Sequence, residues 1–131
     1  MTGADTNILI RYLIEDDAGQ ATRVHRHLKE SRMAGEAVFV SVIVLCEVAW
    51  VLRTGYQRTK PEILSAIERL IELEGFQVED QDLVNEAVLL ARSGKGDFAD
   101  YLTGLRNLRQ GCRVTVTFDR ALKDASAFHV W

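Results

Sequence analysis

Hydrophobic residues recur along this chain with two different spacings. Apolar positions three or four residues apart predict amphipathic helices, and short apolar runs bounded by turn residues predict strands. Helices are predicted over residues 8–14, 18–33, 41–56, 61–73, 80–92 and 98–109, with a helical turn at 120–123. Short strands are predicted to end at residue 5 and to cover residues 37–40, 76–78, 114–117 and 128–131.

Strands that alternate with helices are typical of an α/β fold, in which helices cover both faces of a mainly parallel central sheet. A length of 131 residues suits one domain, so residues 1–131 are expected to form a single domain. In such folds a ligand binds beyond the carboxyl ends of the strands. The functional site is therefore expected where strands pass into helices.

The segment 41–53 is nearly all apolar and contains one carboxylate, Glu47. Apolar residues lie on every side of a helix drawn through it, which predicts a fully buried helix with Ser41 as its N-cap. Burying an unpaired carboxylate is costly or drives it to take up a proton. We therefore expect Glu47 to have a partner, either a basic side chain, hydrogen-bond donors or a cation.

Charge is distributed unevenly along the chain, although the net charge is only −3. Between residues 62 and 86, eight acidic residues stand against one basic residue, Arg69, so the remainder carries +4. A basic face beside an acidic one suits a polyanionic partner such as nucleic acid. Two solvated faces would give the same counts, so charge alone leaves both readings open.

The N-terminus and the cysteines favour a cytoplasmic protein. No basic segment followed by an apolar core marks a secretion signal, and the longest apolar run is too short to span a bilayer. Cys46 and Cys112 lie far apart and lack metal-site spacing, so free thiols are expected. His25 and His27 fall in a mixed polar helix and are expected to be solvated.

Acidic residues occupy the predicted junctions between strands and helices. Asp5 follows the first strand, and Asp119 follows the strand at 114–117. Asp97 and Asp100 open the helix at 98–109 after a glycine loop. Each has a structural explanation, because Asp is a good N-cap and this last pair has capping-box spacing. Capping does not explain Glu47, which lies in mid-helix.

Carboxylates that converge at one sheet edge would repel each other unless a cation lay between them. Oxygen ligands without His or Cys nearby suit a hard cation such as Mg²⁺ or Mn²⁺. Such a cation polarises a phosphodiester and lowers the pKa of an attacking water. The pattern therefore favours metal-dependent phosphoryl transfer.

Four segments that contain these acids follow one another along the chain. They are Asp5-Thr6-Asn7, Glu47 in its apolar helix, Gly96-Asp97-Phe98-Ala99-Asp100-Tyr101-Leu102 and Thr117-Phe118-Asp119-Arg120. Together they resemble the PIN-domain ribonucleases, and more narrowly the VapC-type toxins of bacterial toxin–antitoxin pairs. The resemblance covers essentially the whole chain. It implies a three-layer α/β/α PIN-like domain, Mg²⁺- or Mn²⁺-dependent cleavage of RNA, a cognate antitoxin and commonly a homodimer, with a higher toxin–antitoxin assembly also open.

The resemblance also implies roles for individual residues. Asp5 and Asp100 match the direct metal ligands. Glu47 and Asp119 would act on a second metal or on water. Secondary candidates are Asp97, which a cap explains equally well, and the hydrogen-bonding residues Thr6, Asn7 and Thr117. One departure is the polar start of the chain, where the family usually has an apolar strand.

An antitoxin would have to reach this site. By resemblance, its segment is expected to cross exposed apolar surface near the second and third helices and to place a basic side chain among the carboxylates. The RNA target and the number of metals are not encoded in any motif, because selectivity for RNA lies in surface shape and loop contacts.

Other functions fit the same residues less well. A phosphoaspartyl phosphatase would need a second Asp two residues after Asp5, where this chain has Asn7. A DNA nuclease of the same fold would use the same chemistry, but the short chain leaves no room for elements that clamp DNA. A catalytically degenerate PIN-like module that only binds protein would be expected to have lost part of the acidic set. Metal-dependent cleavage of RNA separates these alternatives.

Overall fold

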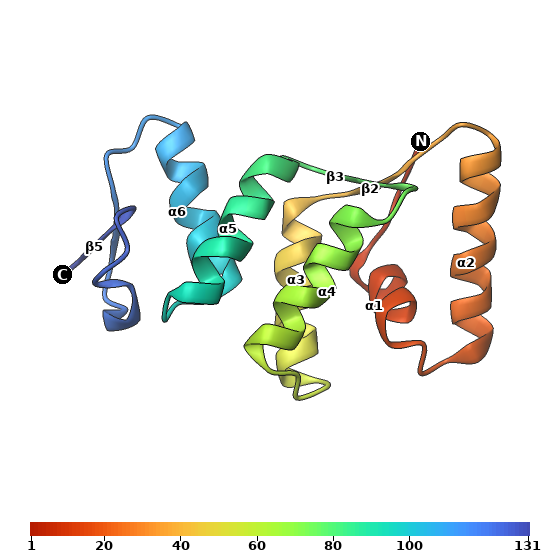
Figure 1. Cartoon of the computed structure of the whole chain (residues 1–131), viewed down its shortest axis with the longest axis horizontal. Helices are drawn as coiled ribbons and strands as arrows, with labels where there is room; N and C mark the ends of the chain where they lie inside the picture. The colour runs from red at the N-terminus through yellow and green to blue at the C-terminus, as the bar shows by residue number, and fades with distance from the viewer. The chain divides into compact units, whose positions relative to one another are not determined.

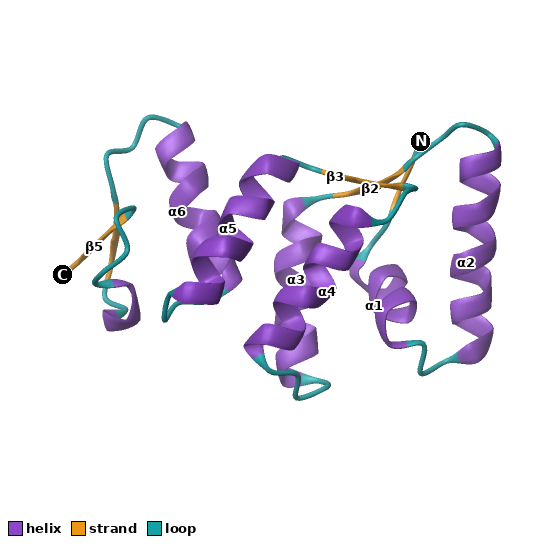
Figure 2. Ribbon diagram, in the orientation of Figure 1, coloured by secondary structure: helices purple, strands orange, loops and turns teal.

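The computed structural model describes residues 1–131, which form two compact units, Met1–Glu79 and Asp80–Trp131 (Figure 1). The first unit contains β1 (Thr2–Gly3), α1 (Thr6–Ile14), α2 (Ala18–Met33), β2 (Val38–Val40), α3 (Val42–Thr54), α4 (Lys60–Glu72) and β3 (Phe76–Val78). The second contains α5 (Gln81–Ser93), α6 (Phe98–Arg109), β4 (Thr115–Thr117), the 3-10 turn η1 (Arg120–Leu122) and β5 (Phe128–Val130). Figure 2 shows how short the strands are beside the helices.

The strands of the first unit form a parallel sheet in the order β1-β2-β3. Val38 of β2 lies opposite both Thr2 of β1 and Phe76 of β3. Successive residues of a strand point to opposite faces. Val38 and Val40 are accordingly buried, whereas Phe39 between them is half-buried. In Figure 1, α1, α3 and α4 lie together below these strands, and their buried sides complete the core of the unit.

Side chains at the helix starts explain where the helices of the first unit begin. Asp17 accepts a hydrogen bond from the backbone of α2 at 3.0 Å, and Ser41 accepts one from the backbone of α3 at 3.2 Å. Thr59 and Glu62 form a reciprocal capping box at the start of α4. Caps of this kind stabilise a helix by about 1 kcal/mol. The residue at which each of these helices begins is therefore encoded in the local sequence.

The second unit pairs two helices with a small sheet. α5 packs against α6, and β4 pairs in parallel with β5. The Asn107 side chain of α6 donates a hydrogen bond to Thr115 of β4 at 2.8 Å. Gly104 lets α6 approach β5 closely, because a Cβ atom there would lie 2.6 Å from the Phe128 ring. These contacts fix the helix that begins with Asp97 against the strand that leads to Asp119.

All the helices and strands predicted from the pattern are present, and α2, β3 and α6 have the predicted bounds. β1 is shorter than a usual strand, although the Ala4 N–H continues its pairing with the Phe39 carbonyl at 2.9 Å. α3 ends at Thr54, before the predicted residue 56. Every strand pair is parallel, which confirms the α/β class. None of the helices has both the length and the apolar character that a membrane crossing needs.

Candidate functional site

Asp5 lies where β1 passes into α1 and is the N-cap of that helix. Its Oδ1 atom accepts a hydrogen bond from the backbone N–H of Ile8 at 3.1 Å. The side chain is exposed, and its second oxygen makes no hydrogen bond or ion pair. Asp5 therefore caps a helix and still offers one oxygen to a cation.

Thr6 and Asn7 differ in how they can contribute. Thr6 is buried, with only 7% of its surface exposed. Asn7 is exposed and lines a cleft that also includes Asp5. Of these two secondary candidates, only Asn7 is placed to contact a ligand directly, because Thr6 is enclosed in the fold.

The cleft beside Asp5 has a volume of about 510 Å³ and runs between α1 and α2. Arg11, Arg23 and His27 line it together with Asp5 and Asn7. Arg23 forms no ion pair with an acidic side chain. An exposed cation without an acidic partner attracts phosphate groups. The cleft thus combines a carboxylate with positive charge.

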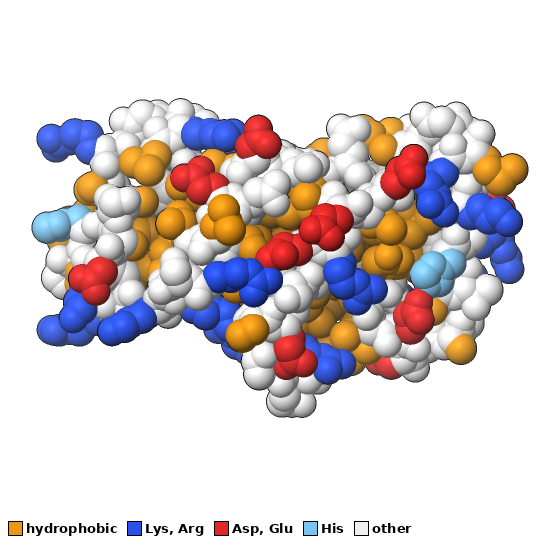
Figure 3. All heavy atoms as spheres, viewed as in Figure 1, with side chains coloured by type: hydrophobic (Ala, Val, Ile, Leu, Met, Phe, Trp, Pro, Cys, Tyr) orange, Lys and Arg blue, Asp and Glu red, His pale blue; other side chains and the backbone are white.

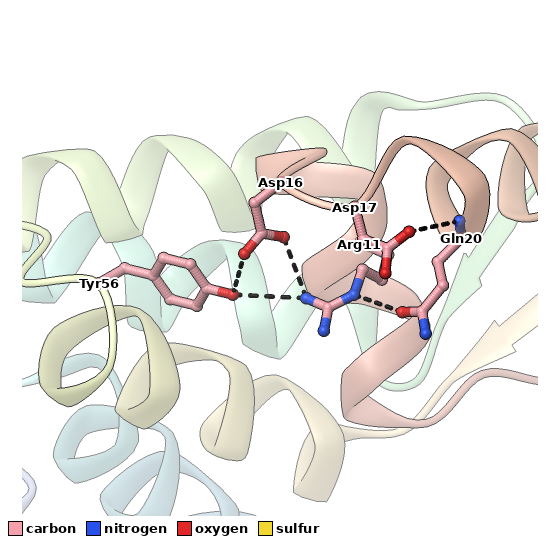
Figure 4. A network of polar contacts seen from close by, with 5 residues as sticks. All are labelled: Arg11, Asp16, Asp17, Gln20 and Tyr56. Carbon is pink, nitrogen blue, oxygen red and sulfur yellow. Dashed lines mark hydrogen bonds and ion pairs between the residues drawn. The ribbon is translucent and has the colours of Figure 1, made fainter.

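Arg11 connects the end of α1 to neighbouring segments (Figure 4). Its guanidinium donates to Gln20, to Asp16 at 3.1 Å and to the Tyr56 hydroxyl oxygen at 3.4 Å. The Tyr56 hydroxyl donates to the other Asp16 oxygen at 2.9 Å. The hydrogen bond with Tyr56 raises the pKa of Arg11, desolvation opposes it, and the Asp16 charge raises it further. Arg11 is therefore engaged in holding α1, which leaves Arg23 as the cation available to a ligand.

Glu47 lies on an exposed side of α3, which corrects the prediction of a helix that is buried all round. The buried side of α3 consists of Val42, Leu45, Val48 and Leu52. Ile43 and Trp50, about one turn before and after Glu47, are 76% and 65% exposed. Every side of this helix carries hydrophobic residues, but the first unit covers only one side.

Because Glu47 is exposed, it does not need a partner to offset burial. It makes no ion pair with Arg11 or Arg53, the two basic residues that would have explained it structurally. The prediction that Glu47 is buried and therefore needs a partner is wrong. The carboxylate is nevertheless ionisable, exposed and without another role in the fold.

Asp97 and Asp100 begin α6 as a capping box. The backbone N–H of Asp97 donates to Oδ2 of Asp100 at 2.9 Å. Both side chains are half-buried. The Asp100 Oδ1 atom has no such partner, so Asp100 resembles Asp5 in offering one oxygen to a ligand.

The glycine loop before Asp97 is packed tightly in the second unit. The backbone N–H of Gly96 donates to the Tyr101 hydroxyl oxygen at 3.1 Å. A Cβ atom on Gly96 would lie 2.5 Å from Leu122 of η1 and 3.2 Å from the Tyr101 ring. The loop that leads into Asp97 therefore lies against the turn that Asp119 begins.

Asp119 begins η1 directly after β4. Its Oδ1 atom accepts a hydrogen bond from the Ala121 N–H at 2.9 Å, and its own N–H donates to the Thr117 hydroxyl oxygen at 3.0 Å. The side chain is exposed, and its second oxygen makes no hydrogen bond. Thr117 thus helps to fix the backbone of Asp119 rather than its carboxylate.

The chemistry of these carboxylates fits a hard cation. Asp5, Asp100 and Asp119 each use one oxygen in a backbone hydrogen bond and keep the other. Carboxylate oxygens are the ligands that Mg²⁺ and Mn²⁺ prefer. Within either unit, no group of three or more acidic, His or Cys side chains lies close enough to hold a metal by itself. The convergence of these acids at one sheet edge stays a prediction.

Two features of the first unit were missed by the sequence argument. Arg23 and His27 line the cleft, and the His27 ring shares a hydrogen bond with the Thr2 hydroxyl at 2.8 Å. Their spacing of four residues on α2 places them on one helix face, which is the signal that could have indicated them. The Glu79 carboxylate accepts a hydrogen bond from the Val42 N–H at 3.3 Å and so supports the start of α3.

Similarities to known proteins extend over both units. Residues 4–127 match the family described as the PIN domain. The chain is also 28% identical over 119 residues to a protein from Aquifex aeolicus (strain VF5) described as a VapC ribonuclease. This similarity covers 91% of the chain and 87% of that protein. The family match includes every acidic position discussed above.

Proposed function

Because the chain belongs to the PIN-domain family, we propose that it is a metal-dependent endoribonuclease and the toxin of a type II toxin–antitoxin pair. The similarity to a protein described as a VapC ribonuclease supports RNA as the substrate. The observation that carries the proposal is the state of three carboxylates at helix starts. Asp5, Asp100 and Asp119 are each oriented by a backbone hydrogen bond and each keep one oxygen for a ligand.

In this proposal the four acids have two different roles. Asp5 and Asp100 are the direct ligands of Mg²⁺ or Mn²⁺. Glu47 and Asp119 bind a second ion or hold water. When bound, the cation polarises the phosphodiester and lowers the pKa of an attacking water. The contribution of the chain is to orient these oxygens, and the caps do so by fixing each carboxylate against a helix start.

The cleft beside Asp5 supports a role in holding the RNA backbone. Arg23 lines it without an acidic partner, and His27 and Asn7 add polar groups. Contacts to phosphate position a nucleic acid without reading its sequence. We expect Arg23→Gln to weaken RNA binding and to reduce the dependence of that binding on salt. An unchanged salt dependence would contradict this role.

Metal-dependent cleavage of RNA by the purified chain, free of antitoxin, tests the proposal. Labelled single-stranded RNA should be cut with Mg²⁺ or Mn²⁺ and should stay intact with EDTA. A DNA strand of the same sequence should resist cleavage. Cleavage that persists in EDTA, or no cleavage of RNA with either metal, would contradict the proposal, and cutting of DNA alone would favour a DNA nuclease.

Variants of the acids assign the ligands. Asp5→Asn and Asp100→Asn keep the shape of each side chain but remove its charge, and both should abolish cleavage in a folded protein. Glu47→Gln should also reduce cleavage with little change in stability. Asp82→Asn is the matched control, because Asp82 is an exposed acid of α5 outside the proposed set. An active, well-folded Asp100→Asn variant would show that Asp100 is not a ligand.

The partners follow from the same proposal. A cognate antitoxin would inhibit the enzyme by crossing exposed apolar surface and placing an Arg among the carboxylates. A complex that leaves these acids open to solvent would contradict this.

We also propose a single catalytic domain over residues 1–131, a homodimer and a cytoplasmic location. Sedimentation of the free toxin tests the dimer. Sequencing the RNA ends after expression without antitoxin would identify the target.

A further inference from the structure

Phe118 and Trp131 form an exposed aromatic pair in the second unit. Their ring centroids are 6.0 Å apart, and the rings meet edge to face at 77°. Phe118 is 79% exposed and Trp131 is 70% exposed. In an edge-to-face pair, the ring that contributes its edge does not use either of its faces to contact the partner ring. The pair therefore presents flat aromatic surface to solvent.

The backbone holds this pair at the ends of two paired strands. Phe118 directly follows β4, and Trp131 directly follows β5. Thr117 pairs with Val130, and the Trp131 N–H donates to the Thr117 carbonyl at 2.8 Å. This hydrogen bond fixes Trp131 beside the start of the Phe118–Asp119 segment. The aromatic surface consequently adjoins a carboxylate of the proposed active site.

Several basic residues lie close to Phe118 in the sequence. Arg113, Arg120 and Lys123 are exposed and form no ion pairs, whereas Arg106 and Arg109 contact Asp80 at 3.5 and 3.9 Å. Figure 3 shows several Lys and Arg side chains, with hydrophobic and acidic groups between them, around the part of the chain that carries β5. Exposed aromatic rings among cations are typical of surfaces that bind single-stranded nucleic acid, where bases stack and phosphates meet the positive charge.

We propose that Phe118 and Trp131 form a stacking platform for a base of single-stranded RNA next to Asp119. This inference rests on the proposed ribonuclease function and adds a substrate contact to it. Stacking accepts any base, because every base has a flat face. The platform would therefore hold the strand near Asp119 without selecting its sequence.

Binding of a labelled single-stranded RNA of mixed sequence tests the platform. Fluorescence anisotropy is measured in EDTA, so that no cleavage occurs. Phe118→Ala and Trp131→Ala should each weaken binding by at least about fivefold, the lower end of what stacking contributes per base. Phe118→Tyr should keep the affinity of the natural chain. Leu89→Ala is the matched control, because Leu89 is 68% exposed in the same unit and lies on α5.

Tryptophan fluorescence gives an independent reading of stacking. The chain has two tryptophans, Trp50 and Trp131. In a Trp50→Phe variant only Trp131 emits, and RNA should quench its fluorescence. If the aromatic pair instead bound a protein, the contact would also include Val116, the exposed apolar residue of β4. A base stacked on the two rings does not need Val116, so Val116→Thr should leave RNA binding unchanged.

The outcomes separate this inference from the function on which it rests. If the natural chain cleaves and binds RNA, but Phe118→Ala and Trp131→Ala bind as tightly as it does, the platform is refuted and the ribonuclease function stands. If the natural chain neither binds nor cleaves RNA, both are refuted. If the two variants instead change only the sedimentation of the protein, the pair is an interface with a second copy.

Discussion

Replacing Gly104 and Gly19 by alanine should change stability in opposite directions. Gly104 lies inside α6, where a Cβ atom would come within 2.6 Å of the Phe128 ring and 3.1 Å of the Ala127 side chain. Gly19 lies in the first turn of α2, where the nearest atom to a Cβ would be an Asp17 oxygen at 3.6 Å. The same chemical change therefore meets a packed ring in one helix and ordinary contact distance in the other.

The expected magnitudes follow from these distances. Alanine favours a helix over glycine by about 0.5–1 kcal/mol. Overpacking a core costs about 1–3 kcal/mol, because neighbouring groups must shift. Gly104→Ala should thus lower the free energy of unfolding by roughly 0.5–2 kcal/mol after both effects are combined. Gly19→Ala should raise it by about 0.5 kcal/mol, since only the helix preference changes.

Urea unfolding followed by circular dichroism measures both changes. For a chain of this length, a difference of 1 kcal/mol corresponds to a shift in Tm of about 3–5 °C. A Phe128→Leu substitution, which removes the ring, should make Gly104→Ala less destabilising than it is in the natural chain. If Gly104→Ala were as stable as the natural chain, Phe128 would not pack on α6 in solution, and the account of how α6 is held against β5 would be wrong.

Three further predictions test the local structure around the proposed site. Asp5→Ala should lower the free energy of unfolding by about 1 kcal/mol through loss of a cap, whereas Asp5→Asn should leave it nearly unchanged, because Asn caps as well as Asp; equal losses in urea unfolding would contradict the cap. Hydrogen bonds from Thr59 lower the pKa of Glu62, so its stabilisation is present above the ordinary glutamate pKa of about 4.3 and is lost as the pH falls through the lowered value. In the Glu62→Gln variant, the free energy of unfolding should therefore fall less steeply with decreasing pH below about pH 4.3. The same pH dependence in the variant and the natural chain would count against these hydrogen bonds. Gly96→Ala should reduce both stability and RNA cleavage, because its Cβ would lie 2.5 Å from Leu122, and full activity would show that the loop before Asp97 tolerates displacement.

The local pattern predicted the helices well because their starts are encoded locally. Asp17 and Thr59 cap α2 and α4, and the buried residues of both helices recur at three- and four-residue spacing. β1 was harder to delimit, because two exposed residues carry almost no pattern. The parallel pairing followed from the alternation of strands and helices, which leaves few other connections.

The exposed side of α3 could not be predicted in the same way. Its sequence is apolar on every side, so hydrophobic spacing cannot indicate which side the fold covers. Ile43 and Trp50 are as hydrophobic as the buried residues but lie in solvent. Burial depends on which elements pack against a helix, and that is a property of the fold. The prediction that Glu47 is buried was wrong for this reason.

The points where strands pass into helices were predictable from the pattern, and parallel folds bind ligands at such points. Asp5 and Asp119 follow their strands directly, as the pattern indicated. Arg23 and His27 were not predictable, because a cleft between α1 and α2 depends on how those helices pack. Sequence order therefore indicated the carboxylates, and only the three-dimensional structure added the basic side of the cleft.

Capping and metal binding had been competing explanations for these carboxylates, and the hydrogen bonds remove that competition. A carboxylate has two oxygens, so Asp5, Asp100 and Asp119 can each hold a backbone N–H with one and a cation with the other. Replacing one of them by alanine should therefore change stability and chemistry together, whereas asparagine keeps the cap and removes the charge. Glu47 differs, because it is exposed, caps nothing and forms no ion pair. Glu47→Gln should therefore leave the unfolding curve unchanged, so that any loss of RNA cleavage reports on the reaction alone.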